Sequence, residues 1–413
     1  MIPVEEAVEL VMKEIRVIGL EKVDILSSFG RVVAEDIYSG WDVPSFDNSA
    51  MDGYALKSSD IKEASRERPT VLKIIEEIPA GQMYKRIVCN KEATRIMTGA
   101  PIPPGADTVV PIEHTERDKD EVRIFKESKK DDNIRASGED VRTGDLVISK
   151  GTVLRPAEVG MMASVGRAFV HVYQMPRVAI ISTGDELVDV DNELTKGKII
   201  NTNRYTLMSQ VRECGGVPMS LGIAGDTEEE IEKKFGEAAH ADVIVSSGGV
   251  SVGDYDLVRV VLKKMGAEMK FSRVAMRPGQ PLTFGLMEGR PVFALPGNPV
   301  SSMISFEQFV RPSLLKMSGF RKIFRPVVYA LLQEDISQKP GRKCFLRCTV
   351  SLKDHNYCVR PTGEQGAGIL MSMVKSNGLL VLPEDKTDLK AGDKVRVQLL
   401  DKSFESEENP NYG

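Results

Sequence analysis

Between residues 175 and 322, short runs of aliphatic residues alternate with longer amphipathic segments. Runs such as RVAIIST, VPMSLGIA, DVIVSS and RPVFAL are typical of buried strands. The segments TNRYTLMSQVRE, TEEEIEKKFGEAAHA and YDLVRVVLKK have the apolar spacing of helices, and Thr227 is the expected N-cap of the second. Strands that alternate with helices of about ten to fifteen residues predict a parallel sheet with helices on both faces.

The segments on either side of this region have a different pattern. Residues 4–18 have helical spacing, and RPAEVGMMASVG predicts a helix with Pro156 in its first turn. From about residue 43, β-rich runs such as TVLKIIEEI alternate with turns such as GAPIPPGAD, which predicts a small β-rich module. After about residue 323, runs such as CFLRCTVSL and DKVRVQLL predict a small all-β domain.

Composition argues against several classes of function. The chain has 413 residues, a net charge of −5 and no run of Lys and Arg, so nothing indicates nucleic-acid binding. It has no apolar stretch of about 18 residues and no signal-like N-terminus, so we expect a cytoplasmic protein without a membrane span. The five cysteines are scattered, which favours thiols in a reducing compartment over a metal site.

Three loops rich in small and polar residues follow the predicted buried strands: STGDEL (182–187), SSGGVSVGDYD (246–256) and PGNPVSS (296–302). Ligands of open parallel sheets bind beyond the carboxyl ends of the strands, so the three loops predict one pocket, although each alone could be a tight turn. Hydroxyl and backbone N–H groups suited to phosphate come from Ser246, Ser247, Gly248 and Gly249. Ser301 and Ser302 begin a predicted helix whose dipole also favours an anion.

Carboxylates stand at the same predicted strand ends: Asp185, Glu186, Asp226, Asp254 and Asp256. Acids beside phosphate-binding loops are expected where Mg²⁺ is held by one or two carboxylates together with substrate phosphates. The alternative is that they are N-caps and solvated turn residues, which we favour for Asp254 but not for Glu186 or Asp256. Elsewhere, the acid-rich loop DVPSFDNSAMDGYAL has the pattern of a functional loop, and Arg277 in MRPGQP is a candidate anion contact.

Eight motifs in collinear order carry a resemblance to a known family: SFDNSAMDGYA, TGAPIPPGADTVV, GEDVRTGD, STGDEL, NTNRYTL, SSGGVSVGDYD, MRPGQPLTFG and LPGNPVSS. Together they resemble the molybdopterin molybdenumtransferase family, MoeA, to which the gephyrin E domain is related. The resemblance runs from residue 4 to about residue 400, which is nearly the whole chain.

The resemblance implies a multidomain protein of α/β and β domains. Its central three-layer α/β molybdopterin-binding domain would span 175–322. An N-terminal helical and linker domain would comprise 1–42 and 141–174, around an inserted β-rich domain at 43–140. A C-terminal β-barrel would span 323–403. The polar composition of the last residues, 404–413, separately predicts a disordered tail. The resemblance also implies a homodimer, with the site between the central domain of one subunit and the N-terminal regions of the other.

The implied reaction takes adenylylated molybdopterin and molybdate, cleaves the phosphoanhydride, releases AMP and leaves molybdenum on the dithiolene. The implied cofactor is Mg²⁺. Expected protein partners are an upstream adenylyltransferase and downstream proteins that accept the molybdenum cofactor.

Carried over motif by motif, the implied catalytic residues are Asp52, Glu186, Asp226 and Asp256, of which the last three would also hold the metal. The implied substrate-binding residues are Thr98, Asp140, Ser246, Ser247, Gly248, Gly249, Arg277, Pro296, Asn298, Pro299 and Ser301. One departure is that Arg277 and Gln280 stand where the family often has lysines implicated in binding the oxyanion, and Gln280 loses a charge. The preference for molybdate over tungstate is therefore open.

Three alternative functions remain at this point: a tungstate-inserting homologue, a molybdopterin adenylyltransferase, and a non-catalytic scaffold like the receptor-binding E domain of gephyrin. Retention of Asp52, Glu186 and Asp256 together argues against the scaffold, which would have no need for the acidic set.

Overall fold

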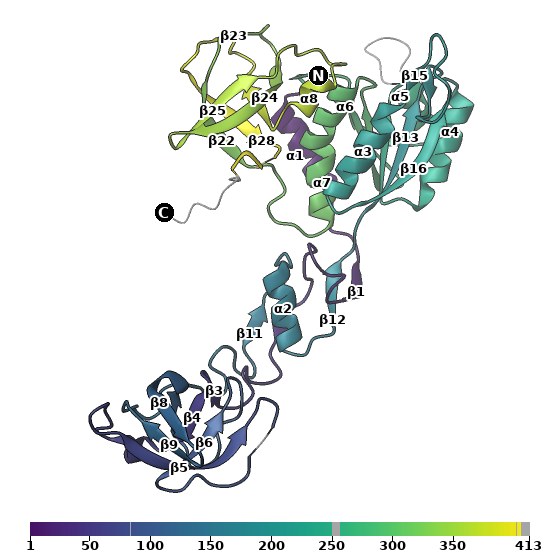
Figure 1. Cartoon of the computed structure of the whole chain (residues 1–413). Coiled ribbons are helices and arrows are strands. Elements are labelled where there is room, and N and C mark those ends of the chain that lie inside the picture. The colour runs from purple at the N-terminus through teal and green to yellow at the C-terminus, as the bar shows by residue number, and fades with distance from the viewer. Residues whose placement is uncertain (83, 250–256, 402, 406–413) are drawn as a thin grey trace. The chain divides into compact units, whose positions relative to one another are not determined.

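A computed structural model describes residues 1–82, 84–249, 257–401 and 403–405 (Figure 1). The chain divides into two compact units, and the second is an insertion within the first. The first unit comprises Met1–Glu21, Gly30–Ala34 and His171–Gly413, and the second comprises Lys22–Phe29 and Glu35–Val170. The predicted domain boundaries are finer than this division and stay predictions.

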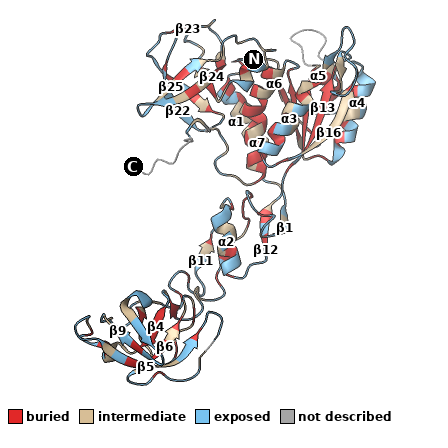
Figure 2. Ribbon diagram, viewed as in Figure 1, coloured by how far each residue is buried: buried red, intermediate tan, exposed pale blue. Residues whose placement is uncertain are grey.

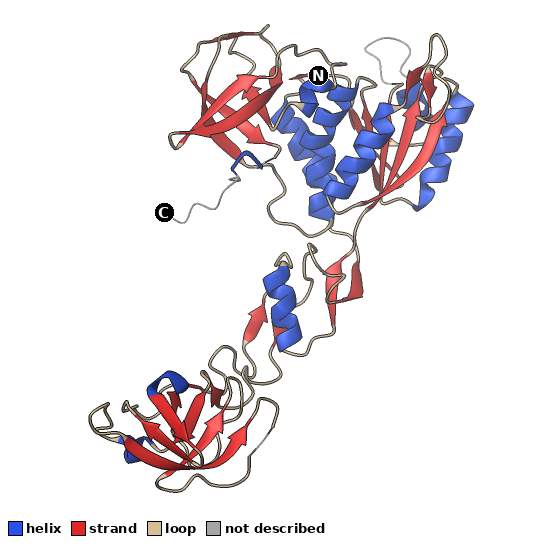
Figure 3. Cartoon of the chain, in the orientation of Figure 1, coloured by secondary structure: helices blue, strands red, loops and turns tan. Residues whose placement is uncertain are grey.

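The first unit contains a six-stranded sheet of order β16-β13-β17-β21-β20-β18 (Figure 3). The four strands that run parallel are β13 (Arg177–Thr183), β16 (Val217–Ala224), β17 (Val243–Ser247) and β21 (Arg290–Leu295). The predicted parallel arrangement is wrong for one strand: β20 (Thr283–Met287) runs in the opposite direction and pairs antiparallel with β21 and with β18 (Glu268–Phe271). The reason is a two-residue turn between β20 and β21, at Glu288 and Gly289, whose φ angles of 51° and 78° suit a tight hairpin.

Helices cover both faces of this sheet, as predicted, because successive residues of its strands point to opposite sides. Val178 and Ile180 of β13 belong to a core shared with α1 (Val4–Glu14), α3 (Thr202–Glu213), α6 (Pro299–Ser305) and α7 (Arg311–Met317). Ala179 and Ile181 belong to a second core, shared with α4 (Glu228–Glu237) and α5 (Leu257–Lys264). Figure 2 shows the buried residues gathered on the strands between these layers.

Local signals explain several helix ends. Thr227 caps α4 as predicted, because its hydroxyl oxygen accepts a hydrogen bond from the Glu230 N–H at 3.3 Å. Pro156 lies at the start of α2 (Pro156–Ser164), also as predicted. The helix predicted at 4–18 ends earlier, because Ile15 takes an extended conformation. The helix predicted to begin at Ser301 and Ser302 is interrupted by a π-helical turn, η4 (Phe306–Val310), just before Pro312, which has no N–H for a regular helix.

The C-terminal part of the first unit is a closed five-stranded barrel, as predicted. Around the ring the strands are β24 (Lys343–Lys353), β25 (Asn356–Pro361), β22 (Val327–Leu332), β28 (Lys394–Leu399) and β26 (Gly378–Leu382). The ring closes because β26 also pairs with β24. Smaller elements are β19 (Met276–Arg277), which pairs with β24, the β23 (Ile336–Ser337) and β27 (Asp388–Leu389) pair, α8 (Met371–Val374) and η5 (Ser403–Glu405).

The second unit is rich in β-strands, in agreement with the sequence. Its six-stranded sheet has the order β7 (Thr108–Pro111), β4 (Gly53–Leu56), β6 (Glu92–Ile96), β5 (Thr70–Ile78), β9 (Glu121–Ile124) and β8 (Thr115–Asp118). Two short pairs join β2 (Ile37–Tyr38) to β11 (Leu146–Ile148) and β3 (Asn48–Ser49) to β10 (Ile134–Arg135). The chain passes between the units along β1 (Leu20–Asp24) and β12 (Phe169–Tyr173). No described helix has both the length and the apolarity needed to cross a bilayer.

Candidate functional site

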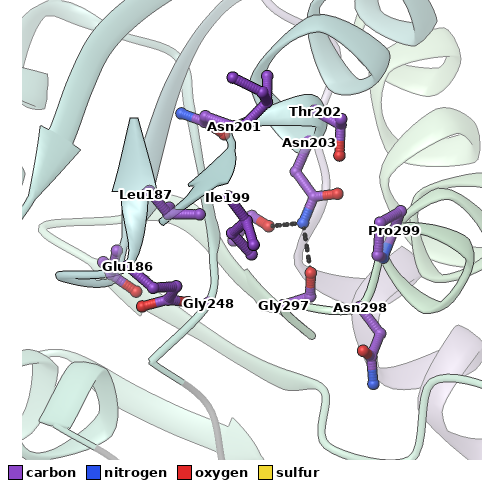
Figure 4. A pocket seen from close by; sticks show the side chains of 13 residues that line it. Glu186, Leu187, Ile199, Asn201, Thr202, Asn203, Gly248, Gly297, Asn298 and Pro299 are labelled. Carbon is purple, nitrogen blue, oxygen red and sulfur yellow. Dashed lines mark hydrogen bonds between the residues drawn. The ribbon is translucent and has the colours of Figure 1, made fainter. Parts of the chain in front are cut away.

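A cavity of about 330 Å³ lies at the carboxyl ends of β13, β17 and β21 (Figure 4). All three predicted loops contribute to it: Glu186 from the first, Ser247 and Gly248 from the second, and Asn298 and Pro299 from the third. The first turn of α3 and the short strands β14 (Leu187–Val188) and β15 (Ile199–Ile200) complete the lining. This volume is within the range of small-molecule sites.

Two glycines let the loop after β17 cross closely over the end of β13. Gly248 has a φ of 95°, and a Cβ there would lie 2.3 Å from the main-chain oxygen of Thr183. Gly249 has a φ of 62°, and a Cβ there would lie 2.7 Å from the Thr183 hydroxyl oxygen. Glycine is therefore required at Gly248 by the protein's own backbone, whatever ligand the pocket takes.

Two asparagines at the start of α3 connect the three strand ends. Asn201 caps α3, because its Oδ1 accepts a hydrogen bond from the Arg204 N–H at 3.2 Å, and the same oxygen lies 3.1 Å from the hydroxyl of Ser182 at the end of β13. Asn203 donates through Nδ2 to the hydroxyl oxygen of Ser247 at 2.6 Å and to the carbonyl oxygen of Gly297 at 2.7 Å (Figure 4). A single N-x-N segment thus fixes the ends of β13, β17 and β21 relative to one another.

The carboxylate of Glu186 is the one acidic group among the lining residues that the structure describes. Its side chain has no hydrogen-bond or ion-pair partner among the described residues, and it folds back towards Gly184. Asp185 and Asp226 bond reciprocally instead: each main-chain N–H donates to the other carboxylate, at 3.2 and 3.1 Å. Asp226 does not line the cavity. Within the described residues, no three acidic, His or Cys side chains gather closely enough to hold a metal ion.

The other predicted residues of the central domain lie outside the lining. Ser246 and Ser301 are buried, and Gly249 and Pro296 lie beside the lining residues in the sequence without forming part of it. Arg277 is exposed on β19 next to the barrel, while Gln280 accepts a hydrogen bond from Arg342 at 2.6 Å. The guanidinium of Arg342 therefore lies beside the position where the family often has a lysine. Asp256 is outside the described residues.

In the second unit the structure brings Asp52 and Thr98 together. Asp52 accepts hydrogen bonds from the main-chain N–H and the hydroxyl of Thr98, both at 2.7 Å, and these bonds lower the pKa of the Asp52 carboxyl. Asp42 and Thr143 repeat the arrangement, with both distances 2.8 Å. Asp140 is exposed. The recurrence indicates that one oxygen of Asp52 has a structural role.

Several lining residues were not singled out as site residues: Thr183, Leu187, Ile199, Ile200, Asn201, Thr202 and Asn203. The segment NTNRYTL carried a usable signal, because an Asn before a helical pattern is a typical N-cap. The sequence carried no signal for the contacts of Asn203, because its two partners lie 44 and 94 positions away.

Comparison with family models covers most of the chain. Residues 2–166 match the MoeA N-terminal region (domain I and II), residues 179–316 match a probable molybdopterin binding domain, and residues 329–400 match the MoeA C-terminal region (domain IV).

Individual relatives match over nearly their full length. A molybdopterin molybdenumtransferase of Staphylococcus aureus (strain COL) is 34% identical over 411 residues, covering 98% of this chain and 97% of the relative. One from Haemophilus influenzae is 37% identical over 382 residues, covering 92% and 93%. The crystal structure of the molybdopterin biosynthesis MoeA protein from Pyrococcus horikoshii OT3 superposes with a TM-score of 0.80 at 34% identity, covering 97% of this chain and 100% of that one.

Proposed function

This chain belongs to the MoeA family of molybdopterin molybdenumtransferases, and from that premise we propose that it inserts molybdenum from molybdate into adenylylated molybdopterin with release of AMP. It acts in molybdenum cofactor biosynthesis as a transferase. The relatives' names favour neither a tungstate-inserting enzyme, nor an adenylyltransferase, nor a scaffold.

The observation that carries the proposal is the pairing, in one cavity, of a carboxylate with loops suited to phosphate. Ser247 and Gly248 lie at the end of β17, and Glu186 lies at the end of the neighbouring strand β13. We assign phosphoanhydride binding to the hydroxyl and main-chain N–H groups of the β17 loop. Glu186 has no partner among the described residues, so it is available to orient the water that splits the anhydride and to take its proton.

We propose Mg²⁺ as the cofactor. Support comes from Glu186, which supplies one unpaired carboxylate to the cavity, since Mg²⁺ is usually held by one or two carboxylates together with substrate phosphates. Glu186, Asp226 and Asp256 would hold the ion, the second through its oxygen that is not bonded to Asp185. When bound, Mg²⁺ would offset the negative charge of the phosphate oxygens.

We also propose that the protein is a homodimer. Support comes from large apolar side chains that are exposed on the second unit: Leu26, Phe29, Tyr38, Trp41, Leu146 and Phe169. Apolar surface of this kind is typical of interfaces between subunits. An upstream adenylyltransferase, downstream cofactor-accepting proteins and a cytoplasmic location stay predictions.

Incubation of the purified protein with adenylylated molybdopterin, Mg²⁺ and molybdate tests the reaction. We expect AMP and molybdenum-loaded molybdopterin, and a loss of about a hundredfold in rate for Glu186→Gln. The matched control is Glu193→Gln, an exposed glutamate outside the cavity, which should leave the rate unchanged. If the wild-type protein releases AMP no faster than Glu186→Gln does, the proposal is contradicted.

Two further arms of the same experiment address the alternatives. Replacement of molybdate by tungstate measures the oxyanion preference, to which we assign Arg277 and Arg342. Turnover of ATP with molybdopterin, without preformed adenylate, would support the adenylyltransferase instead.

A further inference from the structure

A second cavity, of about 660 Å³, lies at the other end of the six-stranded sheet. Its lining includes Arg177 and Arg290, the first residues of β13 and β21, and Asp242, which directly precedes β17. Thr183, at the far end of β13, lines the cavity described above. At about 3.3 Å per residue, the length of β13 places the two cavities about 20 Å apart. We call the second one the amino-end cavity.

The amino-end cavity has the composition of a small-molecule site. Apolar residues make up half of its lining, among them Val17, Ile18, Leu286 and Met317. The side chain of Val17 is exposed, so part of this apolar wall is open to a ligand. Ligand pockets have volumes of about 300–1,000 Å³ and combine an apolar lining with a few convergent polar groups.

The acidic groups among the described lining residues both have basic partners. The carboxylate of Asp242 accepts hydrogen bonds from Nε and Nη2 of Arg177, at 3.2 and 3.3 Å. The carboxylate of Glu14 lies 2.8 Å from Nζ of Lys270, which also pairs with the exposed Glu268. Ion pairing within the protein therefore accounts for both acids.

The basic groups are not all accounted for in this way. Arg290 is bound by the carboxylate of Glu288 and by the carbonyl oxygen of Ala239. Arg16 has no hydrogen-bond or ion-pair partner among the described residues. Arg177 remains 54% exposed beside Asp242, and exposed ion pairs of this kind are weak. In a protein with a net charge of −5, guanidinium groups available beside an apolar wall favour an anion that has an apolar part.

We propose that the amino-end cavity is a second ligand site, which binds a small organic anion. Its carboxylate or phosphate group contacts Arg16 and Arg177, and its apolar body lies on the wall that contains Val17. The inference goes beyond the proposed function, in which no step uses this end of the sheet. Because the cavity that contains Glu186 is about 20 Å away, both sites can be filled at the same time.

Calorimetry with the full chain and four probes tests the inference: phenyl phosphate, benzoate, inorganic phosphate and benzyl alcohol. The first two carry both an anionic group and an apolar ring, and each of the others lacks one of these. The probes would be titrated into the wild type, Arg16→Ala and Arg212→Ala. The last is the matched control, because Arg212 is an exposed arginine that lines neither cavity.

We expect an aromatic anion to bind the wild type more tightly than inorganic phosphate or benzyl alcohol does. Arg16→Ala should weaken this binding about fivefold at low salt, and Arg212→Ala should leave it unchanged. A preference for phenyl phosphate over benzoate would identify the ligand as an organic phosphate, and the reverse would identify it as a carboxylate. Because Arg16 is exposed and has no partner among the described residues, its replacement should leave the fold intact.

Ser247→Ala separates the two cavities, because Ser247 lines only the one at the carboxyl ends of the strands. If probe binding is lost in Ser247→Ala but not in Arg16→Ala, the probes occupy that cavity and the inference is overturned. Equal affinity for benzoate and benzyl alcohol, equal effects of Arg16→Ala and Arg212→Ala, or no binding of either aromatic anion would overturn it as well. These measurements do not involve AMP release, so failure of the proposed reaction would leave their outcome unchanged.

Discussion

At the scale of single residues, the cavity is determined as much by backbone as by side chains. Gly248 lies where the loop after β17 crosses the main chain of Thr183, and Asn203 holds the next loop through a carbonyl group. Such residues have little freedom to vary, because their neighbours are main-chain atoms that cannot retreat as a flexible side chain would.

Substitution of Gly248 by Ala should destabilise the protein by about 2–4 kcal/mol, because it combines a φ of 95° with a Cβ contact of 2.3 Å. Gly266→Ala is the matched control, since its φ is 79° but nothing lies within 4 Å of the added Cβ. The control should lose only about 1 kcal/mol in urea unfolding. Equal losses for the two variants would show that the crossing with Thr183 costs nothing.

Thr98→Val should raise the pKa of Asp52 towards its ordinary value of 3.8, because the hydroxyl donor is lost while the main-chain donor remains. A lowered folded-state pKa contributes stability above pH 3.8 that is lost as the pH falls through the folded-state value. Stability of the variant should therefore depend less on pH in the acid range. Carboxyl NMR titration and unfolding from about pH 6 to pH 2 measure both effects.

Thr143→Val is the comparison for this prediction, because Thr143 lowers the pKa of Asp42 in the same way. It should raise the pKa of Asp42 and leave that of Asp52 unchanged. If Thr98→Val leaves the Asp52 titration where it was, the hydroxyl contributes nothing to that carboxylate.

At the scale of helices and strands, the sequence was most informative where the signal is local. The N-cap at Thr227, the first-turn Pro156 and the aliphatic runs of β13 and β17 are read from neighbouring residues. The turn at Glu288 and Gly289 makes β20 antiparallel to β21, which the alternation of strands and helices cannot reveal. The π-turn η4 was not predicted, although Pro312 just after it is a local signal; the contact of Glu307 in this turn with Arg325, 18 positions later, could not be read from neighbouring residues.

The same limit applies to the cavity. The three loops could be assigned to one sheet edge from the order of strands, because parallel strands end on the same side. The contacts of Asn203 could not be predicted from the order of strands. They join residues of α3, β17 and the loop after β21, which only tertiary packing brings together. Roles assigned to Asp226 and Asp256 through the family motifs stay predictions.

Glu307→Gln should destabilise the first unit by about 3–5 kcal/mol, because it leaves the guanidinium of Arg325 without its buried counter-ion. Glu307 is 5% exposed, and its Oε2 lies 3.0 Å from Nε of Arg325, while Oε1 accepts a hydrogen bond from Gln210. Glu213→Gln, which removes the 54% exposed second partner of Arg325, should cost less than about 1 kcal/mol. If Glu307→Gln and Glu213→Gln lower the free energy of unfolding by similar amounts in denaturant, Glu307 does not act as a buried counter-ion of Arg325.

At the scale of the whole molecule, each of the two units contains its own residues whose fluorescence or thiol labelling can report on its unfolding. Trp41, the single tryptophan, is in the second unit, while Cys214 and Cys348 are buried in the first, where burial raises the pKa of each thiol to about 12. These thiols should therefore resist labelling in the folded protein, whereas the exposed Cys89 should react readily.

We expect thermal unfolding to proceed in two steps, since each unit has its own cores. Trp41 fluorescence should report one midpoint, and labelling of Cys214 and Cys348 in a Cys89→Ser background should report another. Coincident midpoints at all heating rates would show that the units unfold as one cooperative structure.

The insertion of one unit within the other also has a consequence for synthesis of the chain. Val4, Ala7 and Val11 of α1 belong to the same core as residues of β13, α6 and α7, which are made more than about 150 positions later. At about 5–20 residues per second, the apolar stripe of the nascent helix stays without its partners for some tens of seconds at the slower rate. The ribosome meanwhile delivers the second unit nearly whole, so that unit can fold first, before the segment that precedes it has anything to pack against.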